Sequence, residues 1–181
     1  VKPENSAATM KLEAGFELQL VAAEPMVHDP VALAFDGDGR IWVAEMLGYM
    51  PDIDGKLEDS TYGRISVLED TDGDGKADKD TVFLEKYLLP RAVALVDNDR
   101  TLLFADNEQL YEAEILKDGE GGIKAGKVTL VDENYAEGGN PEHKPNGLMR
   151  ALDNWFYNAK CDLRYKKVNG VWIKEKTEER G

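Results

Sequence analysis

The chain has 181 residues, of which 42% are hydrophobic and 32% are charged, so it has enough apolar surface for one or two ordinary domains with a buried core. Its 22 Lys and Arg residues are outnumbered by 36 Asp and Glu residues, and the resulting net charge of −14 disfavours nucleic acid and anionic membrane surfaces as partners. No apolar run approaches the roughly 18 residues of a transmembrane helix, so the composition predicts no membrane insertion.

Cysteine and histidine are scarce. Cys161 is the single cysteine, which excludes an internal disulfide, a CxxC metal clamp and a CxxCH haem-attachment motif. His28 and His143 are the two histidines, so a zinc site built from His and Cys is disfavoured as well. Residues 1–5 lack the apolar segment of a signal peptide, and we expect none there.

Alternating apolar and polar residues predict short strands along the whole chain, joined by turns rich in Asp, Asn and Gly. The predicted strands cover residues 16–21, 31–35, 41–45, 64–68, 81–84, 92–96, 101–105, 127–131, 147–152, 155–159, 163–168 and 171–174. Residues 109–116 fit either a strand or a short helix, because periodicity alone does not separate the two. Asn169-Gly170 is a strong signal for a type I′ hairpin. No long helical stripe is present, so the predicted fold class is all-β.

A proline-led unit occurs three times, at intervals of about 55–60 residues. Each unit has a proline (Pro30, Pro90 or Pro145), a strand that includes small residues, an Asp-containing turn and an apolar strand that ends in Ala. Proline suits the start of a strand, where no ladder hydrogen bond is lost. Repeats of this length with about four strands each are typical of the blades of a β-propeller.

Three units of this size fill the chain, whereas closed propellers have roughly 4–8 blades. We therefore expect part of a β-propeller, with about three blades in this chain. A lead-in over residues 1–12 precedes the predicted propeller domain at 13–181, whose blade-like units lie near 16–85, 86–140 and 141–181. The preferred interpretation is a fragment of a larger propeller. An assembly of short copies and a β-sandwich of generic hairpins are the alternatives.

The sharpest motif is Asp-Thr-Asp-Gly-Asp-Gly-Lys-Ala-Asp at residues 70–78, which fits the start of an EF-hand-type calcium loop. Ca²⁺ takes roughly six to eight oxygen ligands, and alternate acidic residues can wrap their carboxylates around one centre. The predicted ligands are the carboxylates of Asp70, Asp72, Asp74 and Asp78 and the backbone carbonyl of Lys76. Thr81 replaces the last Glu of an EF-hand, and both flanks look like strands. We therefore expect a structural calcium ion in a β-hairpin loop, with a solvated acidic turn as the alternative.

A set of segments also occurs in a recognisable order, at residues 16–25, 29–36, 41–46, 63–75 and 139–148. Together they resemble the propeller of the secreted "membrane-bound dehydrogenase" proteins that are common in planctomycetes and Bacteroidetes. Those proteins are similar to the sorbosone dehydrogenase and soluble aldose dehydrogenase group, which is quinoprotein glucose dehydrogenase-like. The likeness covers nearly the whole chain, from about residue 12 onward.

The resemblance implies a six-bladed propeller in the periplasm or outside the cell. It implies oxidation of a sugar or a sugar-derived aldehyde or alcohol, with electrons passing to pyrroloquinoline quinone and then to the haem of a cytochrome c domain or protein. Members often continue into helical repeats and a CxxCH domain, which this sequence lacks, so the expectation of a fragment is strengthened. The alternative functions are a non-catalytic propeller that binds glycan or protein and a purely structural, calcium-stabilised domain.

The resemblance also implies site residues, because members use a histidine base and surround the quinone with Arg, Lys and Asn. On this basis His143 and Glu45 are predicted to be catalytic, and Arg91, Asn146 and Arg150 are predicted to bind the quinone. All five stand at or near the starts and ends of the repeated strands, where a propeller has its central pocket. An enzyme needs Arg91, Asn146 and a base to converge, whereas a binding module tolerates them scattered.

Overall fold

The computed structural model describes residues 2–119, 121–136 and 139–177. Nearly all of the ordered elements are strands. The helical pieces are α1 (Pro3–Ser6) and two 3₁₀ turns, η1 (Ala7–Thr9) and η2 (Pro141–His143). None of the helices in these ranges is long and apolar enough to cross a membrane. The all-β prediction is confirmed.

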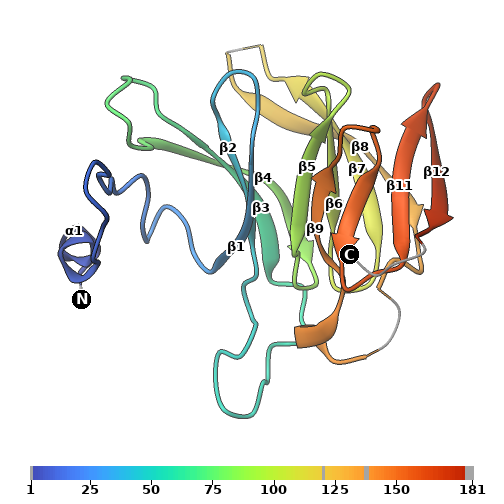
Figure 1. Cartoon of the computed structure of the whole chain (residues 1–181), viewed down its shortest axis with the longest axis horizontal. Helices are drawn as coiled ribbons and strands as arrows, with labels where there is room; N and C mark the ends of the chain where they lie inside the picture. Colours follow the sequence, from blue (N-terminus) through green and yellow to red (C-terminus); the bar gives the residue numbers. More distant parts are fainter. Residues whose placement is uncertain (1, 120, 137–138, 178–181) are drawn as a thin grey trace.

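Twelve strands in the described ranges form three four-stranded antiparallel sheets, each a meander in chain order (Figure 1). We call these sheets blades 1, 2 and 3. Blade 1 contains β1 (Pro30–Phe35), β2 (Ile41–Glu45), β3 (Gly63–Glu69) and β4 (Lys79–Tyr87). Blade 2 contains β5 (Ala92–Val96), β6 (Thr101–Ala105), β7 (Leu110–Lys117) and β8 (Ile123–Asp132). Blade 3 contains β9 (Asn146–Arg150), β10 (Phe156–Ala159), β11 (Leu163–Val168) and β12 (Val171–Lys176).

The tight turns between strands follow from residues that tolerate a positive φ. Asn169 and Gly170, with φ of 51° and 81°, join β11 to β12 as the predicted type I′ hairpin, so that prediction is confirmed. In blade 1 the Asp36 carboxylate closes the turn before β2, because its Oδ1 accepts hydrogen bonds from the backbone N–H groups of Asp38 and Arg40, both at 3.0 Å.

The blades pack face to face through two clusters of buried side chains. In the cluster between blades 1 and 2, Trp42 and Phe83, both of blade 1, meet edge-on with ring centroids 4.7 Å apart. Tyr87 of blade 1 meets Phe104 of blade 2 at 4.9 Å. A second cluster joins blades 2 and 3 and includes Leu103 and Phe156. Each meander therefore buries a face that it could not bury alone.

The first strands of the three blades, β1, β5 and β9, lie side by side (Figure 1). At matching positions these strands carry Ala32, Ala92 and Gly147, which line one common space. Small side chains at these positions let the three inner strands approach closely. The loops that lead into the inner strands are therefore gathered at one end of the array.

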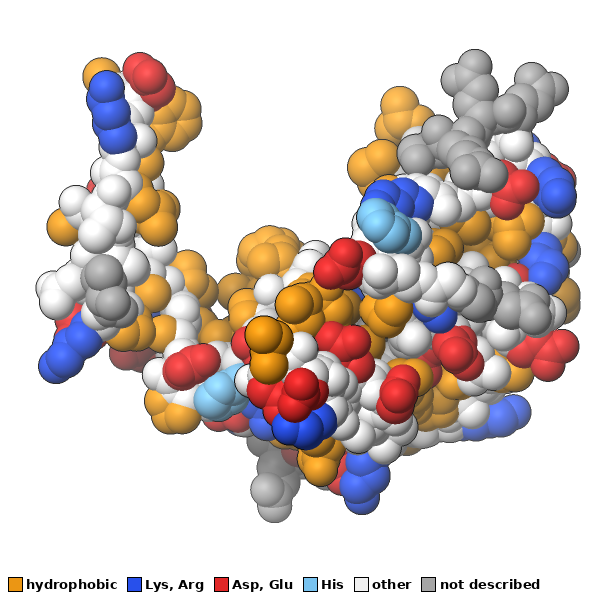
Figure 2. All heavy atoms as spheres, turned by 90° about the horizontal axis from the view of Figure 1, so that it is seen from below, with side chains coloured by type: hydrophobic (Ala, Val, Ile, Leu, Met, Phe, Trp, Pro, Cys, Tyr) orange, Lys and Arg blue, Asp and Glu red, His pale blue; other side chains and the backbone are white. Residues whose placement is uncertain are grey.

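The predicted strand at residues 16–21 is wrong. This segment is extended but pairs with no described strand. It belongs to the arm that precedes β1, and the molecular surface is hollowed between this arm and the blades (Figure 2). The segment is held instead by loop contacts, because the Val21 carbonyl accepts a hydrogen bond from Ala77 N at 2.8 Å and Gln19 Nε2 donates to the Asp74 carbonyl at 3.3 Å. The ambiguous residues 109–116 form a strand, β7, between β6 and β8.

Blade 1 has one face that packs on blade 2 and one face that no described blade covers. Leu33 on the uncovered face is 59% exposed, and Val31 and Phe35 beside it are also exposed. Val93, which holds the position of Leu33 in the next unit, is only 6% exposed because blade 1 covers it. The uncovered face of blade 1 is thus equivalent to a face that is buried between blades 1 and 2.

Candidate functional site

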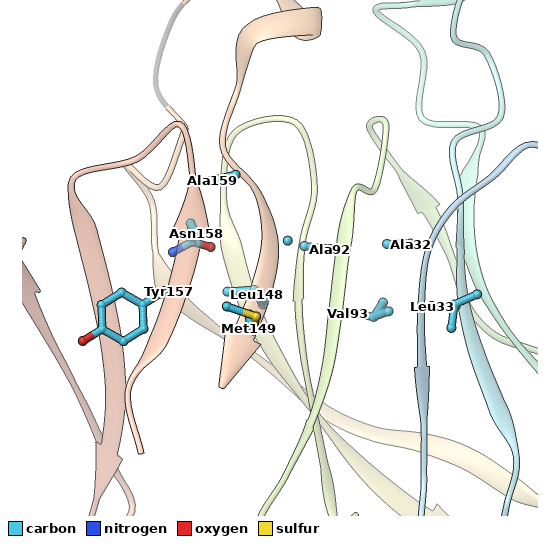
Figure 3. Close-up of a pocket in the computed structure, with 10 residues that line it drawn as sticks. Ala32, Leu33, Ala92, Val93, Leu148, Met149, Tyr157, Asn158 and Ala159 are labelled. Carbon is cyan, nitrogen blue, oxygen red and sulfur yellow. The ribbon is translucent and has the colours of Figure 1, made fainter. Parts of the chain in front are cut away.

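An apolar cavity of about 530 Å³ lies among the inner strands. Figure 3 shows its lining from all three blades: Ala32, Leu33, Ala92, Val93, Gly147, Leu148, Met149, Tyr157, Asn158 and Ala159. None of these side chains is a cation or a strong base. This cavity can hold an apolar group, but it brings no acid–base chemistry of its own.

A second space of about 370 Å³ lies at the end of the array where the inner strands begin, and we call it the Arg91 pocket. It is lined by Val31, Ala32, Met46, Tyr49, Arg91, Pro141, Glu142, Asn146 and Gly147. The structure therefore brings together Arg91 and Asn146, which precede β5 and begin β9. The pocket also holds a carboxylate, Glu142, whose Oε1 accepts a hydrogen bond from the Tyr49 hydroxyl at 3.1 Å.

Arg91 is buried without a counter-ion among the described residues. Its side chain donates from Nη1 to the Pro141 carbonyl at 2.9 Å and from Nη2 to Asn107 Oδ1 at 2.6 Å. The residue is only 6% exposed, and its buried Nε has no hydrogen-bond partner. Burial lowers the pKa of Arg91 from its usual value. Because a buried cation is costly unless it is paired, this guanidinium is suited to an anionic ligand.

His143 lies on η2 next to Glu142 but lines a different space, of about 340 Å³. Its Nδ1 is 3.1 Å from Lys160 Nζ, and a charged lysine can only donate, so Nδ1 is the acceptor in this contact. The structure thus places His143 close to the Arg91 pocket without making it part of the pocket lining.

Glu45 is fully buried at the end of β2, and its carboxylate is already occupied. It accepts hydrogen bonds from Arg64 Nε and Nη2 at 2.8 Å, from the backbone N–H of His28 at 2.7 Å and from the Ser66 hydroxyl. Burial alone would raise the pKa of Glu45, but these bonds outweigh burial and hold it below its usual value. The observed contacts of Glu45 are those of a carboxylate that fixes β2, β3 and the loop before β1.

Arg150 and Asn146 stand at opposite ends of β9, which separates them by about 13 Å along a strand of this length. Arg150 is exposed and donates from Nη2 to Asn154 Oδ1 at 2.7 Å. Of the five predicted site residues, the structure therefore brings together Arg91 and Asn146, sets His143 beside them, and places Glu45 and Arg150 elsewhere.

The acidic loop between β3 and β4 forms a second candidate site. Carboxylate oxygens of Asp70, Asp72 and Asp78 lie within 4.8 Å of one another on the surface. Asp74 and Lys76 meet at the next turn of the loop, where Asp74 Oδ1 accepts a hydrogen bond from Lys76 N at 2.8 Å. A cluster of carboxylates at this spacing suits a hard cation such as Ca²⁺, although exposed acidic groups also occur without an ion.

Backbone hydrogen bonds shape this loop around Asp70. Gly75 N donates to Asp70 Oδ2 at 2.8 Å and Gly73 N donates to Oδ1 at 2.7 Å, and these bonds, led by that from Gly75, hold the pKa of Asp70 below its usual value. Gly73 and Gly75 have φ of 78° and 88°, which favours glycine at both positions. The loop thus favours the charged form of Asp70 and holds it close to Asp72 and Asp78.

A family model described as a domain of unknown function, DUF7133, matches residues 2–180. The chain belongs to the DUF7133 family. No curated protein matches this chain. Its resemblance to solved structures is at the level of the fold.

A gluconolactonase from Xanthomonas campestris is 14% identical to this DUF7133 chain with a TM-score of 0.56, and the match covers 90% of this chain and 52% of the other. Regucalcin from Agrobacterium tumefaciens, described as a calcium-binding protein, is 17% identical with a TM-score of 0.54, covering 82% and 45%. A Trichoderma reesei protein of carbohydrate-active enzyme family AA12 is 13% identical with a TM-score of 0.53, covering 86% and 33%.

These matches confirm the prediction of part of a β-propeller, because the neighbours are propellers and the chain supplies three of the sheets that serve as blades. The DUF7133 chain spans about half or less of the length of these structures. At such low identities the likeness concerns the fold alone.

Several polar residues near the Arg91 pocket of this DUF7133 chain were not expected from the sequence. Asn107 anchors Arg91, and Asp106 beside it is buried, which raises the pKa of its carboxyl group. Glu142 and Lys144 flank His143 in the segment from Pro141 to Gly147. The sequence signal that could have found Asp106 is its position directly after Ala105 at the end of an apolar strand, the place that Glu45 holds after Ala44 in blade 1.

Proposed function

We propose that this chain supplies three blades of a β-propeller that oxidises a sugar or a sugar-derived aldehyde or alcohol, with pyrroloquinoline quinone as the first electron acceptor. The activity and the cofactor come from the resemblance of the sequence to sorbosone and aldose dehydrogenases. The support from the structure is the Arg91 pocket, at the end of the inner strands where a propeller has its central site.

The observation that carries the proposal is the state of Arg91. Its guanidinium is buried, two of its nitrogens are fixed by Pro141 and Asn107, and its Nε is left without a partner. Pyrroloquinoline quinone carries carboxylates, and a carboxylate is the natural partner of such a guanidinium. The residues present therefore fit the group.

In this proposal Arg91 would bind a carboxylate of the quinone, and Asn146 would add an amide donor from the start of β9. The chemistry that a bound quinone would supply is the acceptance of the two electrons released by the substrate. His143 would accept the hydroxyl proton of the substrate at Nδ1 after Lys160 has moved away, since that nitrogen is the acceptor in the present contact. Glu142, which lines the Arg91 pocket, would accept a hydrogen bond from another hydroxyl of the substrate.

The other elements of the function are also proposals. A cytochrome c domain or protein would take the electrons onward, the substrate would be sugar-like, and the protein would work in the periplasm or outside the cell. The acidic loop at residues 70–78 would bind one structural Ca²⁺, a property that the name of regucalcin states for that neighbour. The calcium ion would order a long polar turn and would take no part in the oxidation.

The test is a titration of the 181-residue chain with pyrroloquinoline quinone, in which binding is measured by the change in tryptophan fluorescence. Arg91→Met should weaken binding at least about tenfold, because it removes a charge-assisted hydrogen bond. Arg91→Lys should retain part of the affinity, and Arg150→Met is the matched control that should bind like the wild type. Equal binding by the wild type and Arg91→Met would overturn the proposal and favour a non-catalytic propeller that binds glycan or protein.

A further inference from the structure

The space that His143 lines is separate from the Arg91 pocket and is rich in basic side chains. We call it the Lys144 cavity. Its volume of about 340 Å³ lies within the range of small-ligand sites, roughly 300–1,000 Å³. It is lined by Asn134, Tyr135, Ala136, Gly139, Asn140, His143, Lys144, Pro145, Lys160, Cys161, Asp162 and Leu163. Three of these side chains are basic, in a protein whose net charge is −14.

Lys144 is the central observation. It is only 4% exposed, yet its ammonium group has no hydrogen bond or ion pair with any residue in the described ranges. Asp106, Glu108 and Arg91 act on it through longer-range electrostatics only, and the largest effect is burial, which lowers the pKa of Lys144. The ammonium is not among the fully enclosed atoms that lack a partner, so it keeps accessible surface at the cavity, where an anion can pair with it.

The other basic groups support the same reading of the cavity. Lys160 Nζ donates to His143 Nδ1 at 3.1 Å, and its remaining N–H groups are free to meet an anionic oxygen at the rim of the cavity. The one carboxylate in the described lining, Asp162, has its Oδ2 3.7 Å from the Nζ of Lys176, a residue outside the lining. Asn140 uses its Oδ1 to accept from Glu142 N, which leaves its amide nitrogen as a further donor.

We propose that the Lys144 cavity binds the carboxylate of a sugar acid, so that the substrate class of this protein is an acidic sugar such as a uronate. Lys144 holds the carboxylate, and Lys160 contacts it from the rim of the cavity. The inference rests on the proposed function for the sugar part of the ligand, because His143, the proposed base, lines the same cavity and would face the hydroxyl groups of the bound molecule. Lys144 is a specificity-determining residue in this account.

The experiment is isothermal titration of the 181-residue chain with sodium glucuronate, glucose and inorganic phosphate, with no quinone present. The wild type should bind glucuronate at least tenfold more tightly than glucose or phosphate. Lys144→Met should lose this binding without a fall in Tm, because methionine removes the unpaired charge and keeps the volume. Lys160→Met should also weaken glucuronate binding, and it should not change stability because Lys160 is exposed. Lys124→Met, on the exposed face of β8, is the control and should bind glucuronate like the wild type.

The outcomes separate this inference from the proposed function. Absence of glucuronate binding, or full binding by both Lys144→Met and Lys160→Met, would overturn the Lys144 cavity as an anion site. Equal affinity for phosphate and glucuronate would overturn the assignment of a sugar acid. A lower Tm of Lys144→Met with unchanged glucuronate affinity would make Lys144 a structural residue. Glucuronate binding that depends on Lys144, in a chain that fails to bind quinone, would support this inference and remove only the proposed oxidation.

Discussion

Buried carboxylates at the ends of strands fix the turns within a blade and the contact between neighbouring blades. Asp36 receives hydrogen bonds from Trp42 Nε1 at 2.9 Å and from Arg40 Nε at 2.6 Å. Asp132 at the end of β8 receives them from Tyr165 and Lys174 of blade 3, at 2.9 Å each. Burial opposes the charge of Asp36, Glu45 and Asp132, but their donors outweigh burial, and the pKa of each lies below its usual value. These residues therefore stabilise the fold only while they are charged.

Glu45 tests most directly whether these buried carboxylates stabilise the fold through their charge. Because its folded pKa lies below the usual 4.5, its contribution to stability is complete above that pH and is lost as the pH falls through the folded value. Glu45→Gln should destabilise the chain by about 3 kcal/mol at pH 7, since it leaves Arg64 without its buried partner, and should flatten the acid side of the stability curve. Urea unfolding between pH 3 and pH 7 measures both effects. Glu17→Gln, at an exposed position, should change neither, and an unchanged acid slope in Glu45→Gln would contradict the assignment.

Strand positions were predicted well at the scale of elements, because a strand with one buried face needs alternating residues. The segment 16–21 alternates in the same way and yet forms no strand. Phe16, Leu18 and Leu20 alternate with polar residues, yet alternation says only which side chains could share a face and not whether a neighbouring strand exists. The acidic loop was predictable, because its spacing is local and needs no knowledge of distant segments.

The acidic loop predicts a calcium dependence of stability. A ligand that binds only the folded chain adds about 2.7 kcal/mol at a hundredfold excess over Kd, which raises Tm by roughly 5–10 °C in a protein of this size. Calcium should therefore raise Tm relative to EGTA, measured by thermal unfolding. Asp72→Asn should abolish most of the rise while keeping its hydrogen bond from Asp74 N. Asp54→Asn, in a separate acidic loop, is the control, and a full calcium response in Asp72→Asn would refute a metal site here.

The repeat made the whole-molecule architecture predictable, because the three proline-led units recur with the same order of small strand, turn and apolar strand. The pairing of Arg91 with Asn146 was also accessible, since both stand at the entry of an inner strand. The burial of Lys144 and the contact of His143 with Lys160 were not predictable, because they depend on how the loop after β8 packs beside the turn after β10. Such contacts between loops leave no periodic signal in a single sequence.

Equivalent positions on two blades should respond differently to the same truncation. Val93→Ala should cost about 2 kcal/mol of unfolding free energy, because Val93 is packed between blades 1 and 2. Leu33→Ala removes more atoms from the corresponding position of blade 1, yet it should change stability by less than about 0.5 kcal/mol because that face is uncovered. Chemical unfolding of both variants measures the difference. Similar losses would mean that another surface covers the face of blade 1 in solution.

We propose that the entry of the inner strands forms a quinone site around Arg91. The most direct measurement is a crystal structure of the chain grown with pyrroloquinoline quinone. We expect a carboxylate of the quinone within hydrogen-bond distance of the Arg91 guanidinium, which has no counter-ion among the described residues. A quinone bound elsewhere, with the Arg91 guanidinium still without a counter-ion, would contradict this proposal.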